Sequence, residues 1–489
     1  SRFQQFRDSL FQEYDSFKDK INAEYANFLK ESWQEFQNNK PVDEPVFEPV
    51  LSVPAPMPVE PVKHDANVVV HHADSPTEPT PDAKTVQSDV NRSPADPINS
   101  QNKNKTSHVP DISSNDNITA DPSKSLLPVH FYGLKTSVAV DMLHIPYLLQ
   151  QTEQAVADMW SQLSKNIVPV EPIEALCERN HWCQWAVVQY ADSVAHAVYP
   201  KHHNERTVLQ MWLLSQQGIS ARLAYDNNNR FYILVAVDGG LYGKPYFTLD
   251  DQQYYLLEQT QSESLLICNH EFGQNKPLSL MISHDMTLGD GKSIKVRQLK
   301  SDAYPQMTAD VSVDQDFLNF YAHYPSGFLS DNKLSRWEIL AKAPLCPTTQ
   351  SSLYGAIEQS LEGHSDEERI EMLLNFVQTA FEYGNDNELW GGDRAFFADE
   401  TCYYPYSDCE DRTILFVNLV RHFTNVQVAI LMIPRHLFAA VALPGNPKGM
   451  YITIGDQQFT IADPTCKGAV VGQPMDGVDY SHIEALVVR

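Results

Sequence analysis

Residues 403–421 read YYPYSDCEDRTILFVNLVR, and this stretch decides which fold the sequence predicts. Pro405 ends an extended segment that leads to a helix. Ser407 or Asp408 can cap this helix, which starts directly after them. Apolar residues then recur at the spacing of a buried helix, at positions 415, 416, 419, 420 and 423. We therefore expect Cys409 in the first turn of a buried helix.

A cysteine at the start of a helix lies where its thiolate is stabilised. The unpaired backbone N–H groups and the positive end of the helix dipole lower the pKa of the thiol, and the same groups can bind a developing oxyanion. The neighbouring carboxylates of Asp408, Glu410 and Asp411 raise that pKa instead. A further cation is therefore required, and we expect a histidine from elsewhere in the chain to supply it.

Two strand-like runs follow the predicted helix, at 426–433 and 437–443, and His436 stands at the head of the second. A later run, 458–462, ends at Asp463. The intervals from the cysteine to the histidine and from the histidine to the aspartate are 27 residues each. A nucleophile on a helix, a base on one strand and a carboxylate after another form the Cys–His–Asp arrangement used for acyl transfer.

The DCEDR motif at 408–412, the lone strand histidine and the Asp-Pro-Thr that closes a strand resemble the transglutaminase-like superfamily of papain-like thiol enzymes. The resemblance covers about 391–467 and is weaker outside it. It implies that Cys409 is the nucleophile, that His436 is the general base and acid, and that Asp463 orients the imidazole.

The resemblance also implies an upstream side chain that completes an oxyanion hole, for which Tyr404 and Trp390 are the candidates. The sequence lacks the Gly-Gln-Cys-Trp of the eukaryotic cross-linking enzymes and any evident Ca²⁺ loop, so it looks more like the bacterial members, many of which are peptidases or amidases. We expect no cofactor and no metal. The histidines at 196, 202 and 203 have no partner at metal-binding spacing.

A comparison of the sequence with itself indicates a repeat. Residues 230–237 align with 435–442, and residues 251–256 align with 456–461 at the same offset of 205. A third block upstream aligns after a shift of one residue. Three blocks in the same order predict two copies of one α/β unit.

The first copy lacks the chemistry predicted for the second. The three positions that match the predicted triad hold His203 or Asn204, Phe231 and Glu258. With no thiol and no imidazole at the base position, the first copy resembles a degenerate, catalytically inactive transglutaminase-like domain.

Composition divides the chain into five parts. Residues 1–37 form an amphipathic helix that docks on the globular part or on another protein. Residues 38–128 hold fifteen of the thirty-one prolines and no glycine, which predicts a disordered tether. The degenerate copy follows at 131–270, a β-rich connecting segment at 271–345 and the catalytic-type copy at 346–489. The fold class is α+β, with tandem transglutaminase-like (papain-like cysteine protease) domains of helix plus antiparallel sheet.

The composition of the chain also limits its partners. The 489 residues carry a net charge of −27, which would repel nucleic acid and anionic lipid. The most apolar window, 426–443, is interrupted by Pro434, Arg435 and His436, so no transmembrane span is predicted. Seven cysteines are too few for a disulfide scaffold, and their odd number leaves at least one thiol unpaired.

Together these features predict a periplasmic, secreted or cell-surface bacterial protein from which a leader has been removed. Its C-terminal copy acts on amide bonds of a protein or peptide substrate, as a peptidase, an amidase or a transglutaminase, and Cys409 should react fastest of the cysteines. The alternative is a non-catalytic cell-envelope scaffold or binding subunit that kept the fold. In that reading Cys409 is a relic, and the N-terminal helix and tether reach an envelope protein.

Overall fold

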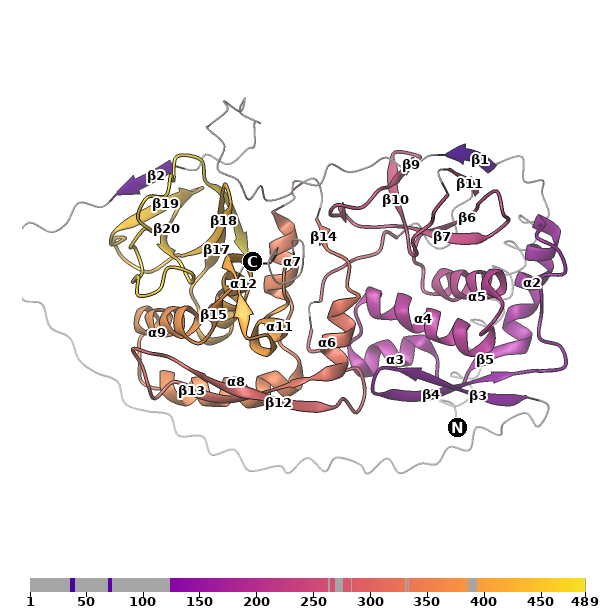
Figure 1. Cartoon of the computed structure of the whole chain (residues 1–489), viewed down its shortest axis with the longest axis horizontal. Helices are drawn as coiled ribbons and strands as arrows, with labels where there is room; N and C mark the ends of the chain where they lie inside the picture. The colour runs from indigo at the N-terminus through magenta and orange to yellow at the C-terminus, as the bar shows by residue number, and fades with distance from the viewer. Residues whose placement is uncertain are drawn as a thin grey trace, which may run out of the picture.

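Two antiparallel sheets, with helices packed on them, organise the chain in the computed structural model (Figure 1). The fold class is therefore α+β, as predicted. The structure describes residues 36–39, 69–72, 124–262, 264–268, 276–282, 284–329, 332, 334–384, 386 and 394–488.

The first unit opens with a small sheet and continues with four helices. The small sheet consists of β3 (Ser125–Phe131), β4 (Leu134–Val140) and β5 (Ile167–Pro169). The helices are α2 (Glu153–Asn166), α3 (Ile173–Asn180), α4 (Gln184–Val198) and α5 (His203–Gln216). The remaining strands are β6 (Ala221–Tyr225), β7 (Phe231–Ala236), β8 (Gly240–Leu241), β9 (Phe247–Leu249), β10 (Gln252–Leu256) and β11 (Leu265–Cys268).

The second unit repeats this sequence of hairpin, helices and sheet. Its hairpin is β12 (Ser293–Lys300) and β13 (Thr308–Asp314). The middle elements are α6 (Gln315–Ala322), β14 (Gly327–Phe328), α7 (Ser335–Lys342), α8 (Pro347–Leu361), α9 (Asp366–Thr379), β15 (Glu382–Tyr383), α11 (Ala398–Tyr403), β16 (Tyr406–Ser407) and α12 (Cys409–Phe423). The last strands are β17 (Val428–Ile433), β18 (His436–Val441), β19 (Met450–Ile454), β20 (Gln457–Ala462) and β21 (Glu484–Val488).

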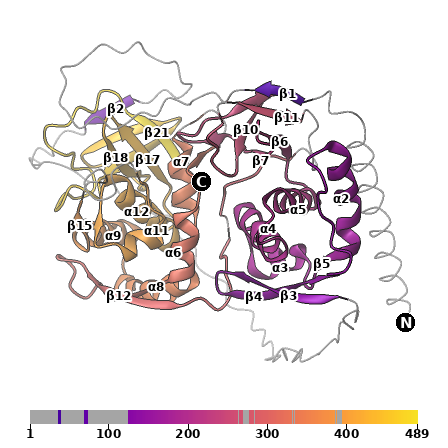
Figure 2. The ribbon, with the colours of Figure 1, turned by 45° about the vertical axis from the view of Figure 1, so that its right-hand side comes forward.

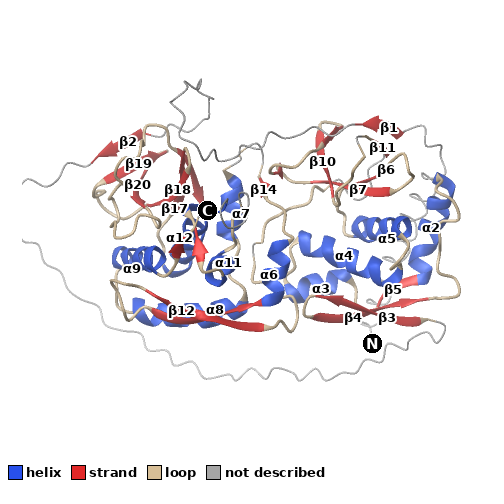
Figure 3. Ribbon diagram, in the orientation of Figure 1, coloured by secondary structure: helices blue, strands red, loops and turns tan. Residues whose placement is uncertain are grey.

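The two large sheets have the same strand order. One runs β11-β6-β7-β10-β9 and the other runs β21-β17-β18-β20-β19. In both sheets, the strand that comes last in the sequence (β11 or β21) pairs with the strand that comes first (β6 or β17). Each unit also has its helices between the large sheet and a hairpin, β3–β4 or β12–β13 (Figure 3). The repeat inferred from sequence stays a prediction, and this common topology is the structural observation that favours it.

The central strands of both sheets, β6 and β7 in one and β17 and β18 in the other, are buried on both faces. In β18, Leu437, Ala439 and Val441 belong to the core that includes α12, whereas Phe438 and Ala440 belong to a separate cluster on the other face. This alternation follows from the two-residue period of a strand. It determines on which side of the sheet each site residue lies.

Two short segments are strands in the structure, one across the end of the predicted helix 1–37 and the start of the predicted tether, and one within the tether. β1 (Phe36–Asn39) pairs with β11, and β2 (Val69–His72) pairs with β19 (Figures 1 and 2). The prediction that 38–128 is only a tether is therefore wrong at these places, because the edge of a sheet offers unpaired N–H and C=O groups to any extended segment. Residues 1–35, which hold most of the predicted helix, and the rest of the tether up to Ser123 lie outside the described residues.

Two predicted boundaries also need correction. Folded structure starts at Ser125 with β3, before the predicted start at Phe131, because β3 pairs along its whole length with β4. The connecting segment 271–345 is not a separate part either, since β13 packs on α8 and the Arg297 guanidinium of β12 donates to Tyr403 O at 2.9 Å. None of the helices in the described ranges has the length and apolar character required to cross a bilayer.

Candidate active site

Cys409 is the first residue of α12, as the sequence predicted. Asp408 is the N-cap, and its backbone N–H donates to the carboxylate of Asp411 at 3.3 Å. The second carboxylate oxygen of Asp411 accepts from the N–H of Phe396 at 2.9 Å. Asp411 therefore fixes both the start of the helix and the loop in front of it.

The pKa of the Cys409 thiol is raised well above its ordinary value, contrary to expectation. Burial is the largest cause, since the residue is 9% exposed, and the charges of Glu410 and Asp408 add to it. The thiol donates a hydrogen bond to Glu410 Oε2 at 3.0 Å. The helix dipole, worth about 0.3–1 kcal/mol, is too weak to outweigh these effects, so Cys409 is held protonated.

His436 and Asp463 form a close pair at the ends of neighbouring strands. His436 Nε2 lies 2.7 Å from Asp463 Oδ2, and the Asp463 side chain is 1% exposed. The other carboxylate oxygen of Asp463 accepts from the N–H of Thr465 at 2.8 Å and of Cys466 at 3.3 Å. The carboxylate is thus held rigidly and can orient the imidazole, while Nδ1 of His436 makes no hydrogen bond to another described residue.

Cys409 and His436 are neighbours but are not hydrogen-bonded to each other among the described residues. A hydrogen bond from the backbone N–H of Leu437, the residue after His436, acts on the Cys409 sulfur and lowers its pKa. Thr413 of α12 also donates to Leu437 O at 3.1 Å. The His436 ring, however, stacks in parallel on Phe438 with centroids 5.4 Å apart, on the sheet face away from α12. A productive contact requires this ring to turn toward the sulfur.

Arg412 ties together the segments that surround the site. It is 3% exposed and donates to Ser407 Oγ at 3.2 Å and to the backbone oxygens of Gln378 and Phe381 at 3.3 and 2.9 Å. The Gln378 side chain in turn donates to Asp463 O at 3.0 Å. One network therefore connects α12, the end of α9 and the segment that carries the carboxylate.

Of the two predicted oxyanion residues, Tyr404 lies in the described part of the chain, and its contacts are with Arg394 and Phe396. The Tyr404 hydroxyl lies 3.5 Å from the Arg394 guanidinium, and its ring packs on Phe396. Trp390 lies outside the described residues.

Tyr383 is the aromatic residue that sequence analysis missed. It lies on β15, opposite Ser407 in a parallel pair, and it is half exposed. The Arg412 guanidinium lies 5.6 Å from the centre of its ring, and the pKa of Tyr383 is raised, first by burial and then by the nearby Cys409. Tyr383 comes close to the start of α12 only because β15 pairs with β16, and its position in the sequence does not predict this pairing.

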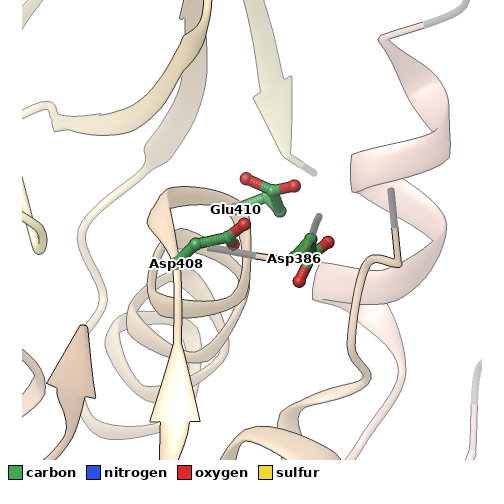
Figure 4. A group of neighbouring side chains, drawn as sticks. All are labelled: Asp386, Asp408 and Glu410. Carbon is green, nitrogen blue, oxygen red and sulfur yellow. The ribbon is translucent and has the colours of Figure 1, made fainter. Parts of the chain in front are cut away.

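Three carboxylates next to Cys409 form a group that could hold a cation. Ligand oxygens of Asp386, Asp408 and Glu410 lie within 4.8 Å of one another, and Figure 4 shows the side chains turned toward one another. Asp408 is 8% exposed, and its Oδ1 has no hydrogen-bond partner among the residues that the structure describes. Oxygen ligands of this kind suit Ca²⁺ or Mg²⁺. The sequence predicted no metal site, and Asp386 joins the other two only through the fold.

No protein-family model, curated protein or solved structure matches this chain.

Proposed function

We propose that the chain catalyses thiol-dependent acyl transfer on amide bonds of a protein or peptide, in the manner of the transglutaminase-like superfamily. The observation that carries the proposal is the 2.7 Å pair of His436 and buried Asp463, next to a helix that begins at Cys409. An oriented base beside a cysteine at a helix start is the arrangement that nucleophilic catalysis requires.

The proposed reaction begins when the His436 ring turns so that Nδ1 takes the proton of the Cys409 thiol. The sulfur then attacks the carbonyl carbon of the amide, and the negative charge on the carbonyl oxygen is stabilised by the N–H groups at the start of α12. Protonated His436 gives its proton to the leaving amine as the C–N bond breaks, and a thioester of Cys409 remains. Water or an amine attacks this thioester, and His436 carries the proton of the attacking group to the departing sulfur.

We assign Tyr383 a supporting role in this reaction. Its ring lies next to Arg412, the third residue after Cys409 on α12, and its side chain is 56% exposed, so a bound substrate can reach it. A phenol at this position can donate a hydrogen bond to the substrate carbonyl. It takes the place that Tyr404 and Trp390 had in the prediction from sequence.

A non-catalytic binding role is the second candidate function. Its support is the raised pKa of the Cys409 thiol together with the orientation of the His436 ring, which faces Phe438. In this case Cys409, His436 and Asp463 would have no catalytic activity, and the unit would serve as a scaffold.

Acylation by an activated ester separates the two candidates. The full chain is treated with the p-nitrophenyl ester of an N-acetylated peptide, and the adduct is located by intact-mass and peptide mass spectrometry. We expect one hydroxylamine-labile thioester on Cys409, none in Cys409→Ala and slower formation in His436→Gln. Cys466→Ala is the matched control, because Cys466 is partly exposed and lies close to Asp463. An adduct on Cys466, or none at all, would contradict the enzyme proposal.

A further inference from the structure

A cavity of about 690 Å³ lies in the first unit, against α4, α5 and the segment after β10. Polar and charged side chains form most of its lining. The charged members are Arg206, Asp192 and Glu258, and four histidines lie with them. Cavities of roughly 300–1,000 Å³ hold small ligands, whose orientation is set by a few polar groups. The charged groups of this lining should therefore indicate the class of ligand.

The cavity lies at the position that the candidate active site has in the second unit. α5 packs on β7 as α12 packs on β18, and the corresponding strands occupy the same places in the two sheets (Figures 1 and 2). His203, which lines the cavity, is the first residue of α5, as Cys409 is the first residue of α12. The first unit therefore has an open site at this position, but without a thiol.

Arg206 has donors that the described wall of the cavity does not use. Its guanidinium lies 3.0 Å from Nδ1 of His203, and a guanidinium carries five N–H donors. The carboxylates of the lining pair with other side chains: Asp192 lies 3.2 Å from His196, and Glu258 lies 3.5 Å from Arg230. An anionic group in the cavity can therefore bind to Arg206 without breaking an ion pair.

Glu258 offers the opposite chemistry, an acceptor without a donor. Because a guanidinium can only donate, His203 Nδ1 accepts from Arg206, and Nε2 carries the ring hydrogen. Nε2 donates this hydrogen to Phe231 O at 2.8 Å. Glu258 Oε1 lies 3.2 Å from the same nitrogen, but it is buried and none of the described residues donates a hydrogen bond to it. A ligand that supplies N–H groups would remove the cost of this unsatisfied acceptor, and the Glu258 side chain, which is 38% exposed, can turn toward it.

The lining also contains an unused donor on an aromatic side chain. Trp185 lines the cavity, and its Nε1 is buried without an acceptor in the described part of the chain. Tyr132, by contrast, donates to Gln189 Oε1 at 2.7 Å, so its hydroxyl is already bonded within the wall. The unused groups of the lining thus include donors on Arg206 and Trp185 and an acceptor on Glu258.

Arg206 and Glu258 contact the two nitrogens of one imidazole ring, so their charged groups lie near each other. The guanidinium is 3.0 Å from Nδ1 of His203, and the carboxylate is 3.2 Å from Nε2. A ligand with negative charge alone would be repelled by Glu258 and Asp192, and one with positive charge alone would be repelled by Arg206. A small ligand that carries both charges a few bonds apart is attracted by both groups. The zwitterion of an α-amino acid has this arrangement.

We propose that the cavity binds a free α-amino acid as its zwitterion, with the carboxylate at Arg206 and the ammonium group at Glu258. A guanidinium can hold a carboxylate through two parallel hydrogen bonds, which fixes the orientation of the ligand. The rest of the cavity, which includes Gln189 and Gln210, is left for the side chain of the amino acid. This inference goes beyond the proposed function and does not depend on the chemistry of Cys409.

The test is a ligand-observed NMR titration of the full chain with each of the proteinogenic α-amino acids. We expect saturable binding of at least one of them. Its N-acetyl derivative, which has no ammonium group, and its amide, which has no carboxylate, should each bind at least about tenfold more weakly, because each loses a charge-assisted hydrogen bond. Equally tight binding of either derivative, or no saturable binding of any amino acid, would overturn the proposal.

Two variants test the assignment of the two charges. Arg206→Gln should weaken binding of the amino acid by about tenfold but not weaken binding of its amide, which has no carboxylate to lose. Glu258→Gln should weaken binding of the amino acid but not that of its N-acetyl derivative. Arg179→Gln is the matched control, because Arg179 is about half exposed, pairs with Glu171 and lies outside the lining.

A variant that weakens the amino acid and both derivatives by the same factor would show that its side chain only supports the fold, and this would overturn the assignment. If neither variant folds, the comparison of the three ligands on the unmodified chain decides the question. Cys409→Ala should bind the amino acid like the unmodified chain, so the result is independent of whether the second unit is an enzyme.

Discussion

Replacing Glu410 by glutamine removes the charge closest to the Cys409 sulfur. Glu410 Oε2 accepts the hydrogen bond of the thiol at 3.0 Å, and Glu410 is the largest cause of the raised Cys409 pKa after burial. The amide of glutamine has nearly the same size, so the variant changes the charge and little else. We expect the pKa of Cys409 to fall and its reaction with iodoacetamide to become faster.

The size of the effect follows from the distance. At 3.0 Å the interaction of two unit charges is worth about 1.4 kcal/mol in bulk water and about 5.5 kcal/mol at an effective dielectric constant of ~20. The charge therefore raises the pKa of the Cys409 thiol, and at the lower limit its removal changes the thiolate fraction by a factor of about ten. A lower pKa increases the thiolate fraction but reduces its nucleophilicity with a slope of ~0.4–0.5, so each unit gives a net gain of roughly threefold. Glu410→Gln should therefore react at least about threefold faster near neutral pH.

The assay measures alkylation of Cys409 in the full chain over a series of pH values, by mass spectrometry of the Cys409 peptide. Glu367→Gln is the matched control, because it removes a carboxylate on α9 that is about half exposed and pairs with Lys448 at 2.8 Å. The reasoning fails if the rate for Glu410→Gln equals that of the unmodified chain, or if Glu367→Gln gives the same acceleration.

Three further predictions concern the structure around the site. Arg412→Met should lower the free energy of unfolding by about 2–5 kcal/mol in urea denaturation, because it leaves buried carbonyl oxygens without a donor, and an unchanged value would show that the network is not structural. Ca²⁺ should raise the Tm of the chain, an excess of chelator should reverse this, and Asp408→Asn should weaken Tb³⁺ luminescence; equal luminescence in the variant would exclude a cation at this group. Burial raises the pKa of Glu400 from 4.5 to about 7, so its contribution to stability is complete below pH 4.5 and is lost as the pH rises through 7. Glu400→Gln should make the stability measured at pH 5 and pH 8 more alike, and the same difference as in the unmodified chain would contradict the raised pKa.

The elements that could be predicted from sequence are those determined by local pattern. The start of α12 at Cys409 follows from a capping residue before an apolar helical repeat, and His436 and Asp463 lie at strand ends that alternation and a proline mark. Their pairing at 2.7 Å is consistent with the expectation that a carboxylate after one strand orients an imidazole at the head of another.

The elements that could not be predicted depend on burial and on contacts distant in sequence. The sign of the Cys409 pKa shift depends on how deeply the thiol is buried, and the sequence contains no measure of that. Tyr383 and Asp386 follow α9 in sequence and reach the thiol only because β15 pairs with β16. β2 was missed because the three consecutive valines at 68–70 lie in a segment whose proline-rich composition predicts a tether, and the edge of β19 supplies the pairing.

A pair of imidazole and carboxylate occurs in both units, so this pair alone does not identify an enzyme. In the first unit His203 comes from the helix start and meets Glu258 after β10; in the second, His436 comes from a strand and meets Asp463 after β20. The second unit differs because its helix start holds a thiol, and Nδ1 of its imidazole makes no hydrogen bond to another described residue. The charge of Glu410 opposes this role because it raises the pKa of the thiol, whereas a cation held by Asp386, Asp408 and Glu410 would offset the same charge. The Glu410→Gln variant removes that charge, so it tests whether the carboxylate is what keeps the Cys409 thiol from reacting.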